Sequence, residues 1–363
     1  MSRPRALIVG GGPAGAAVAL RLAAGGEAPL LLERQRETGN ALCGGFLSWR
    51  SLASLAELGI GADDLNRDRI TRLRLFAGAR WVDAALPAPA LGVSRHRLDV
   101  LLLARAEAAG TWVERGVAVR TIERGTARTA DGVDLTPDAL FLASGKHDIR
   151  GLARPAEARG DDPTLGLRLR LAPAPALTAT LAATIELHLF HRGYAGVLLQ
   201  EDGSANICLA VHRSRLAAAG SPAALLAELG DEAPALGERL AHAADDRGVE
   251  AIANVPYGWR ERHGTAGLFR LGDQAAVIPS LAGEGMGIAL ASARSAAAAY
   301  TRGGAGAATG WQPALARRLG RPLAVAGMVR ALAEGRHAEL LPRLARLPGL
   351  LQAIAAATRV GEG

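Results

Sequence analysis

The feature that most constrains the fold is a glycine-rich turn that joins an apolar strand to a helix near the start of the chain. The sequence reads ALIVGGGPAGAAVAL over residues 6–20. In such a turn Gly10 makes the tight bend, Gly12 lets a phosphate approach the backbone, and Gly15 lets the helix pack against the strand. Free N–H groups and the positive end of the helix dipole then face the phosphate. The segment therefore predicts a βαβ unit that holds a pyrophosphate.

Only the sequence around this turn can indicate that it binds a phosphate, because glycine clusters usually mark ordinary turns and the chain has 45 glycines. Here a second apolar strand, residues 29–33, follows the helix and ends in Glu33, 18 residues after Gly15. An acid at this distance is placed to bind a ribose 2′-hydroxyl. We therefore predict a dinucleotide site in preference to a purely structural turn.

Composition limits the other classes of function. The chain has 363 residues, of which 49% are hydrophobic, enough for two interleaved domains. Its net charge of +7 is scattered, and aromatic residues make up only 4%. No basic run alternates with stacking rings, so we predict no nucleic-acid partner.

Cysteine usage and hydropathy bear on localisation. Cys43 and Cys208 are the only cysteines and lie far apart, which predicts neither a disulfide framework nor a metal site and fits a cytoplasmic protein. No signal-peptide pattern and no apolar run of about 18 residues is present. The Ala/Leu/Arg-rich region 322–359 has two interpretations: packing against the body, which we favour, or peripheral contact with a membrane surface.

Two further strands end in polar turns. Residues 139–142 lead into Gly145 and Lys146, the only lysine of the chain, and residues 267–271 lead into Gly272 and Asp273. The second turn continues into a glycine-rich helix start at 283–287, whose N–H groups suit an anion or a flavin edge. Elsewhere, the pattern predicts that Pro87-Ala88-Pro89-Ala90 interrupts the strands of 70–86 and that 117–119 continues the strand of 112–114.

These segments together resemble the flavoprotein monooxygenase superfamily, which includes aromatic hydroxylases and geranylgeranyl reductases. Cys43-Gly44-Gly45 and Gly283-Glu284-Gly285 are most similar to the geranylgeranyl reductase-like branch. Tyr194 matches the first residue of that branch's substrate-facing Tyr-x-Trp-x-Phe-Pro motif, whereas Gly196 and Leu198 replace the Trp and Phe. The departures predict a divergent subgroup with its own substrate.

The resemblance implies an α/β fold. A Rossmann-type FAD-binding domain is assembled from discontinuous segments, and a smaller α+β substrate domain contains a mostly antiparallel sheet. The expected division is FAD-binding segments at 1–69, 94–154 and 265–302, substrate-domain segments at 70–93 and 155–264, and a C-terminal helical region at 303–363.

The resemblance also implies FAD as the cofactor. Only one full dinucleotide fingerprint is present, so NAD(P)H is expected as a transient reductant. Arg95 matches a cofactor-contacting arginine of the family. The expected cofactor-binding residues are Gly10, Gly12, Pro13, Ala14, Gly15, Glu33, Arg34, Gly44, Arg95, Gly145, Asp273, Gly283, Gly285, Met286 and Gly287.

The function predicted first is monooxygenation of a hydrophobic aromatic or polyketide-like molecule through a flavin peroxide. The alternative is reduction of a carbon–carbon double bond by a geranylgeranyl reductase-like enzyme, in which an acid protonates the carbon beside the one that accepts hydride. Cys43, Tyr194 and His147 are the candidate catalytic residues. A flavin-binding pathway partner without turnover is the remote alternative.

Overall fold

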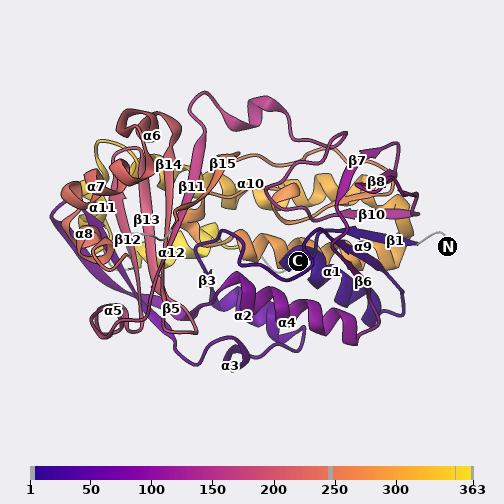
Figure 1. Ribbon diagram of the computed structural model, residues 1–363, viewed down its shortest axis with the longest axis horizontal. Coiled ribbons are helices and arrows are strands. Elements are labelled where there is room, and N and C mark those ends of the chain that lie inside the picture. The colour runs from indigo at the N-terminus through magenta and orange to yellow at the C-terminus, as the bar shows by residue number, and fades with distance from the viewer. Residues whose placement is uncertain (1–4, 244–247, 348, 361–363) are drawn as a thin grey trace.

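The computed structural model describes residues 5–243, 248–347 and 349–360. Figure 1 shows two sheet-based parts side by side, with the long helices α9 and α10 running along the molecule. The N-terminal glycine turn lies in the part at the right, and the larger sheet with its small helices forms the part at the left.

The first part is built on a parallel sheet of five strands in the order β16-β10-β1-β2-β6. These strands are β1 (Ala6–Val9), β2 (Leu30–Glu33), β6 (Trp112–Arg115), β10 (Ala139–Leu142) and β16 (Leu268–Arg270). They come from three separate stretches of sequence, as expected for a Rossmann-type domain assembled from discontinuous segments. Their carboxyl ends meet at one edge, which is where such sheets bind ligands.

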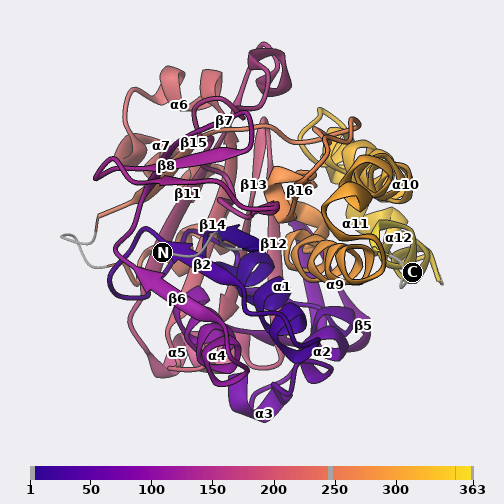
Figure 2. The ribbon, with the colours of Figure 1, turned by 90° about the vertical axis from the view of Figure 1, so that its right-hand side faces the viewer.

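Both faces of the parallel sheet are buried, because side chains alternate across it. Ala6 and Ile8 of β1 join the core beneath the helices, whereas Leu7 and Val9 join a second cluster on the opposite face. The helices on the first face are α1 (Pro13–Ala24), α4 (Arg95–Ala108) and α9 (Gly285–Gly303). Figure 2 shows α1 and α9 adjacent to each other.

A three-stranded antiparallel sheet covers the opposite face. It consists of β7 (Val119–Glu123), β8 (Thr126–Thr129) and β9 (Asp134–Leu135). The expectation that 117–119 continues the strand of 112–114 is therefore wrong. The chain turns at Gly116, which has φ +78°, and Val119 starts a separate sheet whose Ile122 packs on Leu7 and Leu142.

The second part is an eight-stranded sheet in the order β15-β11-β14-β13-β12-β4-β5-β3. Its strands are β3 (Phe46–Leu47), β4 (Ile70–Ala77), β5 (Arg80–Gly92), β11 (Thr164–Leu171), β12 (Thr184–Phe190), β13 (Gly193–Leu199), β14 (Ala205–His212) and β15 (Glu250–Val255). All neighbours pair antiparallel except β4 and β12. The expected α/β fold with a mostly antiparallel second sheet is thus confirmed.

Prolines 87 and 89 do not end the strand as expected. They lie inside β5, where the pairing with β4 shifts from Arg72↔Ala85 to Ile70↔Ala90. The residues between these pairs bulge out of the ladder, and a bulge tolerates proline because it does not need the missing N–H.

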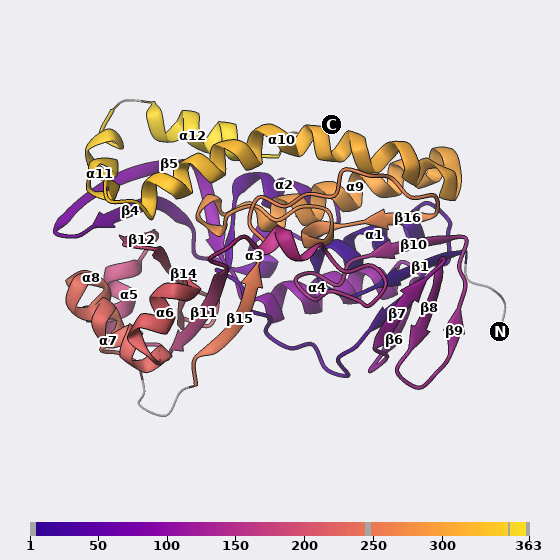
Figure 3. The ribbon, with the colours of Figure 1, turned by 90° about the horizontal axis from the view of Figure 1, so that it is seen from above.

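Small helices cover one face of the large sheet, and α10 with its successors runs along the other side of the molecule (Figure 3). The covering helices are α5 (Pro175–Leu181), α6 (Arg213–Ala219), α7 (Pro222–Glu232) and α8 (Pro234–Leu240). The later ones are α10 (Ala308–Ala333), α11 (Leu341–Leu344) and α12 (Leu350–Thr358), while α2 (Trp49–Ala56) and α3 (Ala62–Leu65) precede β4. Within the described ranges, no helix is both long and apolar enough to cross a membrane.

Candidate functional site

The geometry of the first glycine turn explains why two of its positions must be glycine. Gly10 has φ +105°, and a Cβ there would lie 2.5 Å from the carbonyl oxygen of Ala143. A Cβ on Gly15 would lie 1.8 Å from the carbonyl oxygen of Gly10, so only glycine lets α1 pack this close to β1. Gly12 is the N-cap of α1 and is followed by Pro13, and no side chain caps this end.

Arg95 borders the same turn. Its guanidinium lies 3.2 Å from the position that a Cβ on Gly12 would take. Asp99, one helical turn later in α4, orients Arg95 through bonds of 3.0 and 2.8 Å, and Ser94 caps the start of that helix by accepting from the Arg97 N–H. A cation and the uncapped start of a helix thus face the same space, which suits a diphosphate.

Glu33 ends β2 beside this turn. Its Oε2 accepts from the Gly11 N–H at 2.7 Å, and its Oε1 accepts from the Gln35 N–H at 2.9 Å. These two bonds fix the carboxylate at the carboxyl edge of the sheet, with lone pairs remaining for ribose hydroxyls. Arg34 next to it contacts His147, with 2.9 Å between Nη2 and Nε2.

This contact bears on the prediction that His147 is catalytic. An arginine only donates, so Nε2 of His147 accepts and the ring is neutral. Partial desolvation, Arg34 and Lys146 lower the pKa of His147. The structure places His147 beside Arg34 and Glu33, at the ribose-binding side of the site, and its role stays a prediction.

The second and third turns are tied together. Lys146 Nζ lies 3.3 Å from Asp273 Oδ2, and this carboxylate is the main cause of the raised pKa of Lys146. Gln274, the residue after Asp273, donates through Nε2 to the carbonyl oxygens of Gly145 and His147. Gln274 therefore links the two turns, a role that the sequence pattern does not indicate.

The start of α9 forms the far side of the site. Its N-cap residue, Glu284, caps no N–H with its side chain, so the N–H groups of Gly285, Met286 and Gly287 have no partner within the helix. Gly283 has φ +66°, and a Cβ there would lie 2.9 Å from the ring of Phe46. The free N–H groups at this helix start suit an anion or a flavin edge, and the cofactor-binding role of these residues stays a prediction.

The Glu284 side chain does not cap the helix and is almost fully buried. Burial raises its pKa, while Arg359 and Ser48 stabilise the charged form. Arg359 Nη1 donates to Glu284 Oε1 at 2.5 Å and to the Ala282 carbonyl at 2.8 Å, and Ser48 Oγ donates to Glu284 Oε1 at 2.8 Å. Arg359 also lies over the ring of Trp49. The helix start is thus held by a buried ion pair that sequence spacing does not indicate.

The loop that carries Cys43 is held from the large sheet. Arg168 of β11 donates to the carbonyls of Asn40 and Ala41 at 2.6 and 2.8 Å, and it is 2% exposed. Asn206 of β14 donates to the carbonyls of Cys43 and Gly44 at 3.1 and 3.0 Å. A Cβ on Gly44 would meet nothing within 4 Å, so this position faces open space.

Cys43 lies near the other charged groups of the site. Its Sγ is 3.4 Å from the Gly45 N–H. Lys146 and Cys208 both lie close enough to Cys43 to interact with it electrostatically, and burial is the main cause of the raised pKa of Cys208, which is about 12. Cys208 is therefore an unreactive thiol, whereas the role of Cys43 stays a prediction.

Tyr194 takes part in a chain of three hydroxyl groups. Its oxygen accepts from the Leu281 N–H at 2.9 Å and lies 2.6 Å from Ser280 Oγ, which in turn lies 2.7 Å from the hydroxyl of Tyr257. Burial raises the pKa of both tyrosines, that of Tyr194 strongly, so both stay protonated. The chain joins β13 of the large sheet to the segment that precedes α9.

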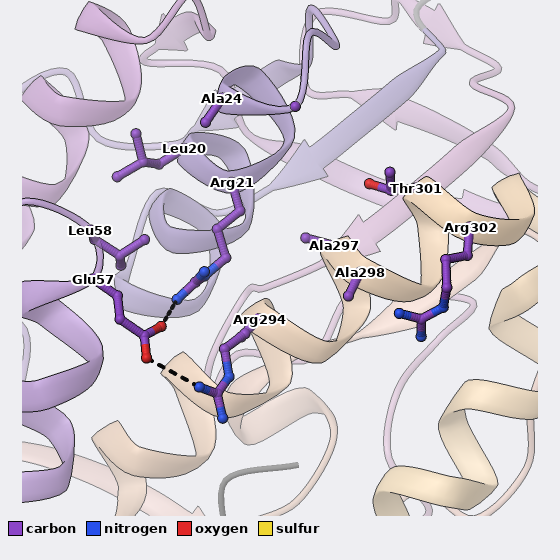
Figure 4. Close-up of a pocket in the computed structure, with 11 residues that line it drawn as sticks. Leu20, Arg21, Ala24, Glu57, Leu58, Arg294, Ala297, Ala298, Thr301 and Arg302 are labelled. Atoms are coloured by element: carbon purple, nitrogen blue, oxygen red, sulfur yellow. Dashed lines mark hydrogen bonds and ion pairs between the residues drawn. The ribbon is translucent and has the colours of Figure 1, made fainter.

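Two recesses differ in how they relate to the predicted site. The smaller, of about 250 Å³, is polar and includes Lys146, His147 and Arg154 in its lining. The larger, of about 570 Å³, lies between α1 and α9, where Glu57 pairs with Arg21 and Arg294 (Figure 4). Its walls come from the later turns of α1 and α9, and no predicted site residue lines it.

The residues present fit FAD. The turn at Gly12 leaves space that a Cβ would fill and has Arg95 beside it, which suits the pyrophosphate. Glu33 suits the adenosine ribose, and Asp273 with the start of α9 suits the ribityl chain and the flavin. When bound, FAD supplies two electrons or activates dioxygen, and NAD(P)H is a typical reductant of flavoproteins of this kind.

Comparisons with known proteins agree with this assignment. The family model described as FAD binding domain matches residues 3–147. A menaquinone reductase from Mycobacterium tuberculosis is 29% identical over 157 residues, which span 40% of this chain and only 38% of that protein. The match thus covers well under two thirds of the curated relative.

Solved structures share the fold over nearly the whole chain. The flavin-dependent brominase Bmp2 superposes with a TM-score of 0.77 at 15% identity, covering 98% of this chain and 93% of that one. PqsL from Pseudomonas aeruginosa gives 0.73 at 18% identity, with 94% and 100% covered. A geranylgeranyl bacteriochlorophyll reductase-like protein from Thermoplasma acidophilum gives 0.72 at 19% identity, with 98% and 93% covered.

Residues 3–147 thus match an FAD-binding domain, the site fits FAD, and the chain shares its fold over nearly its whole length with these solved structures.

Proposed function

We propose that this flavoprotein is an FAD-dependent reductase that saturates an activated carbon–carbon double bond in a hydrophobic, prenyl-like small molecule. The observation that carries the proposal is the chain of hydroxyl groups through Tyr194, Ser280 and Tyr257. Reduction needs a proton donor, because hydride addition to one carbon leaves the neighbouring carbon to be protonated. The partial match to a protein described as a menaquinone reductase, and the fold shared with one described as geranylgeranyl bacteriochlorophyll reductase-like, support a reductase.

The hydrogen bonds favour Tyr257 as the group that delivers the proton. Leu281 N–H occupies an acceptor position on the Tyr194 oxygen. If Tyr194 then donates to Ser280 and Ser280 donates to Tyr257, the proton of Tyr257 remains to be given to substrate. Arg330 lies over the ring of Tyr257, 4.7 Å from its centroid. Burial raises the pKa of Tyr257, whereas the hydrogen bond to Ser280 and the positive charge of Lys146 act in the opposite direction and favour the phenolate that forms. Tyr194 is thus a positioning residue.

The substrate class follows from the surroundings of the hydroxyl chain. Tyr194 belongs to an apolar cluster with Leu75 and Leu189, and Leu187 and Leu281 pack against it. Apolar walls with a few polar groups suit an apolar molecule that is held by one functional group. Lys146 and Arg154, in the polar recess beside the FAD site, suit the phosphates of a visiting NAD(P)H.

Monooxygenation, the function predicted first from the sequence, is the second candidate. PqsL, whose fold the chain shares, is described as a probable FAD-dependent monooxygenase. Both reactions need the same FAD frame and exclude water from it. They differ in whether dioxygen is consumed.

The experiment uses holoprotein reduced without oxygen and a prenylated naphthoquinone as the probe. A reductase yields a product heavier by two hydrogens under anaerobic conditions, and Tyr257→Phe lowers its rate by about 10²-fold, the usual contribution of general acid catalysis. Tyr300→Phe is the matched control, because Tyr300 packs in the FAD-binding domain against Phe141. A product that forms only after air is admitted and carries one added oxygen would instead establish the monooxygenase. Bound FAD that no donor reduces, with or without the probe, would support the non-catalytic flavin-binding partner.

A further inference from the structure

A band of large apolar side chains is exposed where α10 ends and leads into α11. Its members are Met328, Leu332, Leu340, Leu344 and Leu347, with exposed fractions of 68, 50, 45, 42 and 54%. In the described part of the chain nine large hydrophobic residues are exposed to this extent, and five of them fall in this stretch of 20 residues. We call residues 328–347 the leucine band. Such a concentration marks a binding surface better than scattered single residues do.

The charges within the leucine band are mostly positive. Arg336, Arg343 and Arg346 are exposed among the leucines. Of the two acids in the band, Glu339 pairs with Arg80 at 3.1 Å, and Glu334 is occupied by Arg330 and His212. The outer side therefore combines apolar groups with net positive charge.

The inner side of the leucine band is packed against the protein. Ala333 belongs to the apolar cluster that contains Tyr194, and Leu341 packs against that cluster. Arg330, at the start of the segment, covers the ring of Tyr257. Figure 3 shows α11 beside the end of α10 and close to the β4–β5 hairpin. The segment is thus an ordered wall whose outer face has no partner among the described residues.

We propose that the leucine band docks on the surface of a bilayer that contains anionic lipid. Leucines at helical spacing, interleaved with arginines, are typical of helices that lie in the membrane interface. The arginines complement anionic headgroups, and their long side chains can reach these while the leucines enter the acyl boundary. Both interpretations of region 322–359 then hold at once, since its inner face packs on the body and its outer face contacts lipid.

Docking in this orientation places the bilayer on the far side of the wall from the tyrosine hydroxyls. An apolar substrate dissolved in the membrane then has a short path to the proposed site. This consequence rests on the proposed function, whereas the docking itself does not.

The test is co-sedimentation of the holoprotein with vesicles. We expect binding to phosphatidylcholine vesicles that contain about 30% phosphatidylserine, weaker binding at high salt, and little binding to phosphatidylcholine alone. Arg343→Gln and Arg346→Gln each lower the affinity about five-fold, because one arginine near such a surface contributes that factor. Leu340→Ser with Leu344→Ser lowers it further on the same vesicles.

Matched controls lie on the small sheet at the other end of the molecule. Val133 is 47% exposed and Arg120 is exposed, so Val133→Ser and Arg120→Gln change surface groups of the same kind and leave binding unchanged. The proposal would be overturned if the protein bound neutral vesicles equally well, or if the control substitutions lowered binding as much as those in the leucine band. It would also be overturned if the protein bound no vesicles and instead self-associated through the leucines, so that the leucine substitutions abolished the self-association. If the protein converts the detergent-solubilised probe but does not bind vesicles, the docking proposal is refuted and the proposed function stands. If it binds vesicles but does not convert the probe, the proposed function is refuted and the docking proposal stands.

Discussion

Arg359→Met is the substitution whose effect follows most directly from the structure, because it leaves Glu284 charged and buried. The Glu284 side chain is 1% exposed and that of Arg359 is 6% exposed. Removing one partner of such a pair costs about 3–5 kcal/mol, most of it the cost of leaving a charge buried without its partner. We therefore expect the free energy of unfolding to fall by about 4 kcal/mol.

The pH dependence of this loss has a definite sign. Burial raises the pKa of Glu284 in the folded protein, and without Arg359 this pKa rises further. An acid whose pKa is raised by folding binds protons more tightly in the folded state, so it costs stability as the pH rises above its unfolded pKa of about 4.3. Arg359→Met should accordingly recover part of its stability at about pH 5.5 relative to about pH 7.5.

Urea unfolding of three proteins separates the charge from packing. Wild type, Arg359→Met and the double variant Arg359→Met with Glu284→Gln are compared, and the double variant should regain most of the loss because no charge stays buried. FAD titration below the onset of unfolding should show weaker binding for Arg359→Met, since Glu284 immediately precedes the first turn of α9. A double variant as unstable as Arg359→Met would refute the reasoning.

Three further changes have clear outcomes. Gly12→Val should abolish FAD binding, measured by flavin absorbance, because its side chain fills the phosphate space; Gly310→Val, with open space around its Cβ, should keep the flavin. Arg168→Met should release the loop at 40–44 and speed alkylation of Cys43 by at least several-fold, and an unchanged rate would contradict this role. For Glu186, burial raises the pKa, but hydrogen bonds from His188 and Arg239 outweigh this and lower it to about 2. The stability that Glu186 provides, about 3 kcal/mol, should be present above about pH 4.5 and disappear as the pH falls toward 2; a difference between wild type and Glu186→Gln that stays constant from pH 7 to 3 would disprove it.

The fold could be predicted where local chemistry fixes the backbone. Gly10 and Gly15 stand at positions that only glycine can fill, so the sequence reveals the turn and the strand and helix on either side of it. The same applies to Gly283 before α9. Local patterns failed at Pro87 and Pro89, because a bulge that depends on the facing strand decided the outcome.

The supports of the site could not be predicted, because they join residues far apart in the chain. Arg168 reaches a loop about 127 positions earlier, and Glu284 meets an arginine 75 positions later. No local sequence pattern indicates either pairing, because nothing in the sequence distinguishes a buried arginine from the many other arginines of this chain. The sequence predicts only part of the hydroxyl chain. It indicates Tyr194, whereas the contact of Tyr194 with Ser280 depends on the fold, which brings β13 next to η3 (Ser280–Ala282).

The route of the chain between its two sheets limits how such a protein can be altered. β3 belongs to the edge of the large sheet although the loop before it carries a predicted cofactor-binding residue, Gly44, and Arg168 and Asn206 of the large sheet hold that loop. No single cut separates the part that binds FAD from the part that carries Tyr194. A chimera that takes the large sheet from a relative would have to exchange several segments together with these cross-links, so substitutions at single positions are simpler to make than exchanges of whole blocks.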